Sequence, residues 1–162
     1  MSEQPLTEDR LYRLLGQFQA RYVRTIDDDH LESWPDFFAD DCLYIITNAD
    51  NHQRGLQAGL VYADSKGMLH DRVSALRDAN IYEQHSYRHI VGQPLVEAWD
   101  GEEIRTETSF LVARIMRTGE TDLYASGRYL DQYRLADGDL RLSERIVVCD
   151  SRVIDTLLAL PL

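Results

Sequence analysis

The segment that decides the fold is TDLYASGRYLDQYRLADGDLRLSERIVVCDSRV, residues 121–153. Polar and apolar side chains alternate on both sides of the turn-forming stretch ADGD, which predicts two long antiparallel strands joined by a hairpin. In the first strand one face is expected to carry Leu123, Ala125, Gly127, Tyr129 and Tyr133. In the second, Leu140, Leu142, Ile146 and Val148 are expected on one face, with Arg141, Ser143 and Arg145 on the other.

Two further segments upstream show the same period of two. Residues 87–99 and 103–118 each read as a long strand, and the polar turns DGEE and TGE follow them. Gly127 would suit a bulge that bends the sheet. The second half of the chain therefore predicts an antiparallel meander.

The first half has helical periodicity instead. A helix is predicted from Thr7, its N-cap, to about Asp28, and another over 65–79. A short helix is predicted in LESWPDFF, with Pro35 tolerable only near its first turn. Residues 42–47 read as a strand, followed by a polar loop, NADNHQRG.

Helices first and a meander afterwards predict an α+β fold in a single domain spanning 1–162. N-terminal helices packed on a strongly curved antiparallel or mixed sheet would form an open cone. This arrangement resembles the nuclear transport factor 2-like and ketosteroid isomerase (cystatin-like) fold, which by itself says little about function.

Composition excludes several classes of function. A net charge of −11 over 162 residues argues against nucleic acid and anionic membranes as partners. No apolar run is long enough to span a bilayer, and the polar, acidic start predicts a cytoplasmic protein. The two cysteines, Cys42 and Cys149, lack the paired Cys and His spacing of a Rieske cluster and are expected to be buried thiols.

Three of the five histidines, His70, His85 and His89, lie close together in the sequence, which raises the question of an iron site. Four residues along a strand span about 13 Å, so His85 and His89 cannot share one ion if they lie on one strand. We therefore expect no metal site in this chain.

A cone could also hold acid–base chemistry in its pocket, because a buried Asp–His pair can titrate near neutral pH. The candidate side chains for such an enzyme are Asp28, Asp40, Tyr44, His85 and His89. The simpler interpretation is that the carboxylates at 27–29 and 40–41 are solvated helix ends.

Three longer stretches resemble a known family: WPDFFADDCLYIITNADNHQRGL, SKGMLHDRVSALRDANIYEQHSYRHIVG and ERIVVCDSRVIDTLLALPL. W-x-x-F-F, M-L-x-D-R-V and R-H are features of the small (β) subunits of Rieske non-haem iron, aromatic-ring-hydroxylating dioxygenases. TNADNHQRGLQAGLVYADS, ALRDANIYE, RIMRTGETDLYASGRYLD and DTLLALPL are most similar to the terephthalate branch of that family. The anthranilate, salicylate and aminobenzenesulfonate branches come next.

The resemblance implies a chain that carries no cofactor of its own. In this family the [2Fe–2S] Rieske cluster and the mononuclear Fe(II) belong to a separate α subunit, most members assemble as α3β3, and a reductase supplies electrons from NAD(P)H. The β subunit would then be a non-catalytic structural subunit. Residues expected to serve β–β or α–β contacts, or to hold the helix to the sheet, are Arg72, Tyr87, Arg88 and His89. The alternative is a free-standing dehydratase or isomerase on the same fold.

Overall fold

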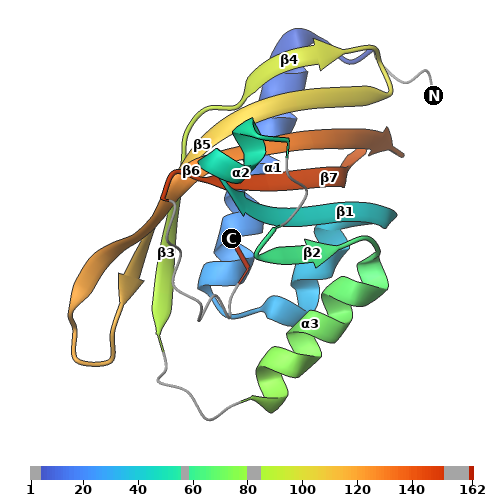
Figure 1. Cartoon of the computed structure of the whole chain (residues 1–162). Helices are drawn as coiled ribbons and strands as arrows, with labels where there is room; N and C mark the ends of the chain where they lie inside the picture. The colour runs from blue at the N-terminus through green and yellow to red at the C-terminus, as the bar shows by residue number, and fades with distance from the viewer. Residues whose placement is uncertain (1–4, 56–58, 80–84, 152–160) are drawn as a thin grey trace.

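The computed structural model describes residues 5–55, 59–79, 85–151 and 161–162. Within them a seven-stranded mixed sheet is packed against helices (Figure 1). The elements in chain order are α1 (Glu8–Asp27), the 3₁₀ helix η1 (Leu31–Phe37), β1 (Phe38–Asn48), α2 (Ala49–Gln53), β2 (Val61–Ala63), α3 (Lys66–Asp78), β3 (Ser86–Val91), β4 (Leu95–Trp99), β5 (Glu103–Ile115), β6 (Thr121–Ala136) and β7 (Asp139–Cys149). Tyr82 and the last residues of the strand expected to end at 153 lie outside the described residues.

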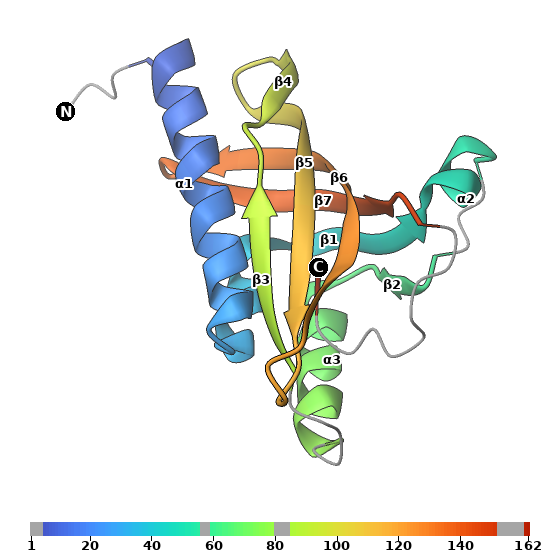
Figure 2. The same cartoon turned by 90° about the vertical axis from the view of Figure 1, so that its left-hand side faces the viewer.

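The α+β class and the mixed, curved sheet are confirmed. The strand order is β2-β1-β7-β6-β5-β3, with β4 paired to β5. β1 and β7 are parallel, and the other pairs are antiparallel. In Figure 2, β3 runs alongside α1, whereas β1 and β7 run across it. The sheet therefore twists around one face of the helix and encloses the core.

The long N-terminal helix α1 begins as the sequence predicts. The Thr7 side chain accepts a hydrogen bond from the Arg10 backbone N–H at 3.3 Å, which satisfies a donor that the first turn leaves free. One stripe of the helix is buried against the sheet and consists of Leu11, Leu15, Phe18, Gln19, Tyr22, Val23 and Ile26.

The helix predicted over 65–79 is also confirmed. Ser65 is its N-cap and accepts from the Met68 N–H at 3.2 Å, and Leu69 and Val73 are buried. The short helix around Pro35 is a 3₁₀ helix, and Pro35 lies inside it rather than in its first turn. The loop expected at NADNHQRG is partly wrong, because Asn48 caps the five-residue helix α2.

The single strand expected over 87–99 is wrong. Two strands, β3 and β4, pair in turn with the same edge of β5, with Val91 opposite Phe110 and Leu95 opposite Glu107. Three residues between them face only two on β5, and Pro94 has no N–H to continue the ladder. The strand therefore breaks at 92–94.

The face assignment in β7 is wrong after its first few residues. Leu142 pairs with Tyr133, but the next pair is Glu144 with Gln132, so Ser143 is an extra residue in the ladder. A bulge of this kind reverses which later side chains point inward. As a result Arg145 is fully buried with Val147 and Cys149, while Ile146 is only half-buried.

The inward face of β6 is confirmed for Ala125, Gly127, Tyr129 and Tyr133, but not for Leu123, which is 66% exposed. Val112 pairs with Ala125 and Ala113 with Leu123, so the bulge falls at Tyr124 rather than at Gly127. Gly127 pairs regularly with both neighbouring strands. It is needed because a Cβ there would collide with the backbone of Val148.

Candidate functional site

The histidines that suggested an iron site are separated in the structure. His70 is exposed on α3, His85 precedes β3, and His89 is buried within β3. Among the described residues, no group of three or more His, Cys, Asp or Glu side chains is placed to hold a metal ion. The donor set of a catalytic iron is therefore not assembled in this part of the chain.

His89 is instead paired with Asp27 at the end of α1. The His89 Nδ1 lies 2.6 Å from Asp27 Oδ1, and the His89 backbone N–H donates to Oδ2 at 2.9 Å. The side chains are only 1% and 2% exposed, and His89 Nε2 is buried without a hydrogen-bond partner among the described residues. The pair joins α1 to β3 at two points.

A second buried polar group lies deeper, where α1 crosses β6 and β7. The guanidinium of Arg145 donates to both oxygens of Asp131 at 2.8 Å, and neither side chain is exposed. Gln19 accepts from Arg145 at 2.8 Å and donates to Asp131 at 3.1 Å and to the Tyr133 hydroxyl at 2.9 Å. This Arg145 network ties three elements together inside the apolar core.

The rings of Tyr22 and Tyr129 enclose the Arg145 guanidinium, with centroids 4.2 and 3.9 Å from its central carbon. Burial alone would lower the pKa of Arg145, but Asp131 and the surrounding tyrosines outweigh it, and the pKa ends above its ordinary value. Burial raises the pKa of Tyr129 and of Tyr133 well above the usual range. The network therefore keeps a charged arginine beside protonated phenols.

The interior of the cone is closed by Leu162, which is 1% exposed. Its carbonyl oxygen accepts hydrogen bonds from the hydroxyls of Tyr44 at 3.0 Å and Tyr22 at 3.2 Å. Its N–H donates to the Tyr44 oxygen at 3.1 Å. The hydroxyl of Tyr44, an expected acid–base residue, is therefore already hydrogen-bonded to Leu162 of the same chain.

The other expected acid–base residues are not brought together. Asp28 and Asp40 are exposed, and the carboxylate that meets His89 is that of Asp27. Asp131 and Gln19 were also not identified from the sequence as buried polar residues, although the sequence pattern around each of them indicates burial. Asp131 lies in phase with Tyr129 and Tyr133, and Gln19 lies on the apolar stripe of α1.

The four expected contact residues have different environments. Arg88 is exposed, Arg72 is half-buried, and Tyr87 and His89 are each 6% exposed. The Tyr87 ring packs on Tyr124 with centroids 5.2 Å apart. His89 and Tyr87 contact their own chain, and Arg88 presents its side chain to the surface.

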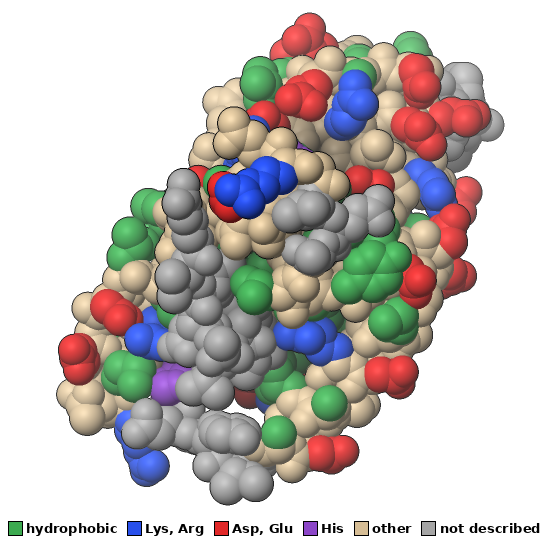
Figure 3. Space-filling model, viewed as in Figure 1, with side chains coloured by type: hydrophobic (Ala, Val, Ile, Leu, Met, Phe, Trp, Pro, Cys, Tyr) green, Lys and Arg blue, Asp and Glu red, His purple; other side chains and the backbone are tan. Residues whose placement is uncertain are grey.

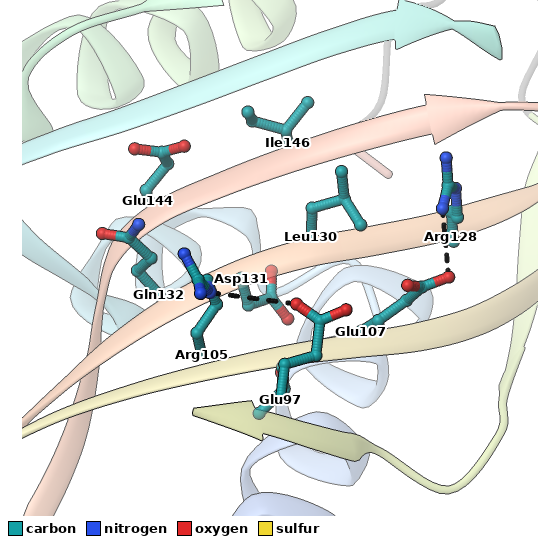
Figure 4. Close-up of a pocket in the computed structure, with 10 residues that line it drawn as sticks. Glu97, Arg105, Glu107, Arg128, Leu130, Asp131, Gln132, Glu144 and Ile146 are labelled. Carbon is teal, nitrogen blue, oxygen red and sulfur yellow. Dashed lines mark hydrogen bonds and ion pairs between the residues drawn. The ribbon is translucent and has the colours of Figure 1, made fainter. Parts of the chain in front are cut away.

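The outer face of the sheet, opposite α1, carries a depression of about 370 Å³ (Figure 4). Leu130 and Ile146 lie side by side on its floor, flanked by the ion pairs Arg105–Glu97 and Arg128–Glu107. Burial raises the pKa of Glu144 at its rim. In Figure 3, acidic side chains spread over much of the face in view, in keeping with the net charge of −11.

The family model "Ring hydroxylating beta subunit" matches residues 21–156. The chain belongs to this family of ring-hydroxylating β subunits.

Relatives agree with the assignment over nearly the whole chain. The β subunit is 57% identical over 148 residues to subunit beta 2 of the terminal oxygenase component of terephthalate 1,2-dioxygenase from Comamonas, covering 91% of this chain and 96% of that one. It is 40% identical to the anthranilate 1,2-dioxygenase small subunit of Burkholderia cepacia, with 97% and 98% covered. A solved structure described as the β subunit of an aromatic-ring-hydroxylating dioxygenase from Novosphingobium aromaticivorans superposes with a TM-score of 0.89 at 40% identity, with 95% and 98% covered.

Membership makes this β subunit a component of a dioxygenase complex. The described part of the chain also contains no helix long and apolar enough to cross a membrane.

Proposed function

We propose that this β subunit is a non-catalytic structural subunit of the terminal oxygenase component of an aromatic-ring-hydroxylating dioxygenase acting on terephthalate. The holoenzyme would cis-dihydroxylate this aromatic dicarboxylate for catabolism in the cytoplasm. The observation that carries the non-catalytic role is the filled cone. The Arg145 network and Leu162 occupy its interior, where an enzyme of this shape would hold a substrate. The terephthalate substrate is inferred from the 57% identity to a terephthalate dioxygenase subunit.

In this proposal the partner is the α subunit, which would carry the [2Fe–2S] Rieske cluster and the mononuclear Fe(II). The described residues of the β subunit do not assemble a set of side chains that fits either group. The proposed assembly is α3β3, with residues 1–162 of each β subunit forming one domain, and a reductase would deliver electrons from NAD(P)H to the α subunit.

The surface proposed for subunit contact lies on the outer face of β3, β5 and β6. Ile90 and Leu111 are cross-strand neighbours and are 63% and 46% exposed. In the adjoining row Arg88 faces Ala113, which in turn faces Leu123. Large apolar side chains exposed next to one another are typical of protein–protein interfaces, and Arg88 would supply a charged contact at their edge.

Co-expression with an α subunit encoded beside this gene, followed by purification through a tag on the β subunit, tests the proposal. A brown complex with a mass near α3β3 that oxidises terephthalate is the expected result. A colourless β subunit that purifies alone would contradict it. Arg88→Ala is expected to weaken assembly, whereas Arg117→Ala, in an exposed turn, serves as the matched control.

One observation favours a second candidate function, a free-standing dehydratase or isomerase. The Asp27–His89 pair is buried and leaves His89 Nε2 without a partner among the described residues, as an acid–base group would. Activity of the isolated β subunit, lost in His89→Gln, would support this candidate. A further alternative is that the holoenzyme oxidises a related substrate such as anthranilate, salicylate or aminobenzenesulfonate. The same holoenzyme assay, run with each of these compounds in place of terephthalate, would detect that activity.

A further inference from the structure

Two opposite charges on the outer face of the sheet have no partner in the described part of the chain. Arg88 on β3 is exposed, and Glu144 on β7 is half-buried at the rim of the depression. Neither side chain forms an ion pair or a hydrogen bond with a described residue. Both arginines of the depression, Arg105 and Arg128, are by contrast ion-paired within the chain. A half-buried carboxylate without a partner is costly, so a cation from outside the chain would stabilise Glu144.

The surface around Arg88 is apolar and exposed. Ile90 lies two residues further along β3 on the same face, and its cross-strand neighbour is Leu111. Arg88 itself lies in a row with Ala113 and Leu123. Ile90, Leu111 and Leu123 are 63%, 46% and 66% exposed, and with Arg88 they form what we call the β3 surface. The β3 surface therefore presents one cation beside three large apolar side chains.

The depression repeats this arrangement with the opposite charge. Ile146 lies two residues from Glu144 on the same face of β7, and Leu130 on β6 is its cross-strand neighbour. Figure 4 shows Leu130 and Ile146 on the floor, with Glu144 to one side. Two residues along a strand span about 6.6 Å, on β3 as on β7. A cation beside an isoleucine on one surface therefore matches an anion beside an isoleucine on the other.

The two surfaces are too far apart to meet within one chain. Arg88 pairs in register with Ala113 of β5, whereas Glu144 lies in a row with Gln132 and Arg105. From Arg105 to Ala113 the strand extends for roughly 26 Å. Figure 2 shows β3 upright and β7 crosswise, so the twist of the sheet turns the two surfaces to different sides. Two different, complementary surfaces on one chain make a head-to-tail contact, and such contacts close into rings.

We propose that the β3 surface of one β subunit docks into the depression of a second copy of the chain, where Arg88 of one copy pairs with Glu144 of the next. Ile90 and Leu111 then cover Leu130 and Ile146 of the neighbouring copy. Three such contacts close the ring of β subunits. The inference rests on the proposed function for the role of the β3 surface in assembly, and it adds the surface that receives it.

The test measures association of the full-length β subunit, purified without an α subunit, by sedimentation equilibrium. The wild-type chain should form trimers at micromolar concentration. Arg88→Glu and Glu144→Arg each place like charges in contact, and each should raise the dissociation constant by about tenfold or more. Arg88→Glu combined with Glu144→Arg restores opposite charges at every contact, and should return the dissociation constant to within about threefold of wild type.

Two controls separate this pairing from a general effect of charge. Arg21→Glu makes the same change in net charge as Arg88→Glu on the exposed side of α1, and it should leave association unchanged. The wild type and the double variant, given tags of different length and mixed, should form separate rings by native mass spectrometry. Every contact between the two kinds of chain would bring like charges together, so randomly mixed rings would overturn the proposal.

A wild-type chain that stays monomeric at high micromolar concentration, or a folded double variant that stays dissociated, would also count against the ring. If Glu144→Arg does not fold, a double-mutant cycle of Arg88→Gln and Glu144→Gln takes its place, and strictly additive effects on the dissociation constant would disprove the pairing.

The outcome is separable from that of the proposed function. A monomeric β subunit that still forms a brown complex with the α subunit would remove this contact alone. A ring of β subunits that no α subunit joins would support the contact and remove the proposed function. Charge variants that release the α subunit while the ring stays intact would assign the two surfaces to the α subunit, against the proposal.

Discussion

The buried ion pair between Arg145 and Asp131 is the contact on which we expect stability to depend most. Asp131→Asn keeps the shape of the side chain but removes the negative charge. Arg145 would remain charged, because a guanidinium is not deprotonated in proteins, and it would be enclosed with no compensating anion. An uncompensated charge in a fully buried position is one of the most destabilising changes a single substitution can make.

The expected loss is about 3–5 kcal/mol, the usual cost of breaking a buried pair by removing one partner. The assay is urea unfolding of the purified β subunit followed by tryptophan fluorescence. With a slope of about 2 kcal/mol per molar urea, the midpoint should fall by roughly 1.5–2.5 M. The slope itself should stay unchanged if the folded and unfolded states keep their compactness.

The ion pair between Arg134 and Asp41 is a matched control. It is also bidentate, with Nη1 to Oδ1 at 2.6 Å and Nη2 to Oδ2 at 3.2 Å, but it is largely exposed. Asp41→Asn should hardly move the urea midpoint, since exposed pairs contribute little. Joint replacement of Arg145 and Asp131 by Met and Leu should cost less than the sum of the single changes. A loss from Asp131→Asn no larger than from Asp41→Asn, or strictly additive effects in the double variant, would refute this reasoning.

Three other outcomes follow from single sites. Gly127→Ala should destabilise by about 2 kcal/mol or more by urea unfolding, because its Cβ would meet backbone, whereas Gly16→Ala on the exposed side of α1 should stabilise by about 0.5–1 kcal/mol. A hydrogen bond from Arg77 lowers the pKa of Glu32 from 4.5 to about 2. The ionised Glu32 therefore adds to folding stability above about pH 4.5, and this stability is lost as the pH falls from 4.5 to about 2. Glu32→Gln should flatten the acid side of the stability–pH curve. Burial raises the pKa of Cys149 to about 12, so a disulfide reagent at about pH 8 should label it only after unfolding, and rapid labelling of the folded chain would contradict its burial.

The local features were predictable because they depend on neighbours in the sequence. The caps at Thr7 and Ser65 and the buried stripe of α1 follow from residues three or four positions apart. The alternation that marks β5, β6 and β7 is likewise a local pattern, and it was enough to predict an α+β fold. The family resemblance carried by long stretches of the chain is confirmed by the family match.

The errors in the sheet share one physical cause, which is that the pairing of a strand depends on its partner strand. Ser143 is an extra residue only in the pairing of β7 with β6, and the bulge there reverses the sheet face toward which the later β7 side chains point. Arg145 therefore moves from an expected outer face to the centre of the core. The break between β3 and β4 depends in the same way on the register against β5.

The sequence by itself determined the helices, the alternating strands, the fold class and the family, because each is written in short-range periodicity or in continuous motifs. Only the tertiary structure decided which polar groups are buried together. His89 meets Asp27 rather than Asp28, Arg145 meets Asp131, and Leu162 meets Tyr44. These contacts join residues from 14 to 118 positions apart, and no local pattern encodes them, because each depends on the curvature and register of the whole sheet.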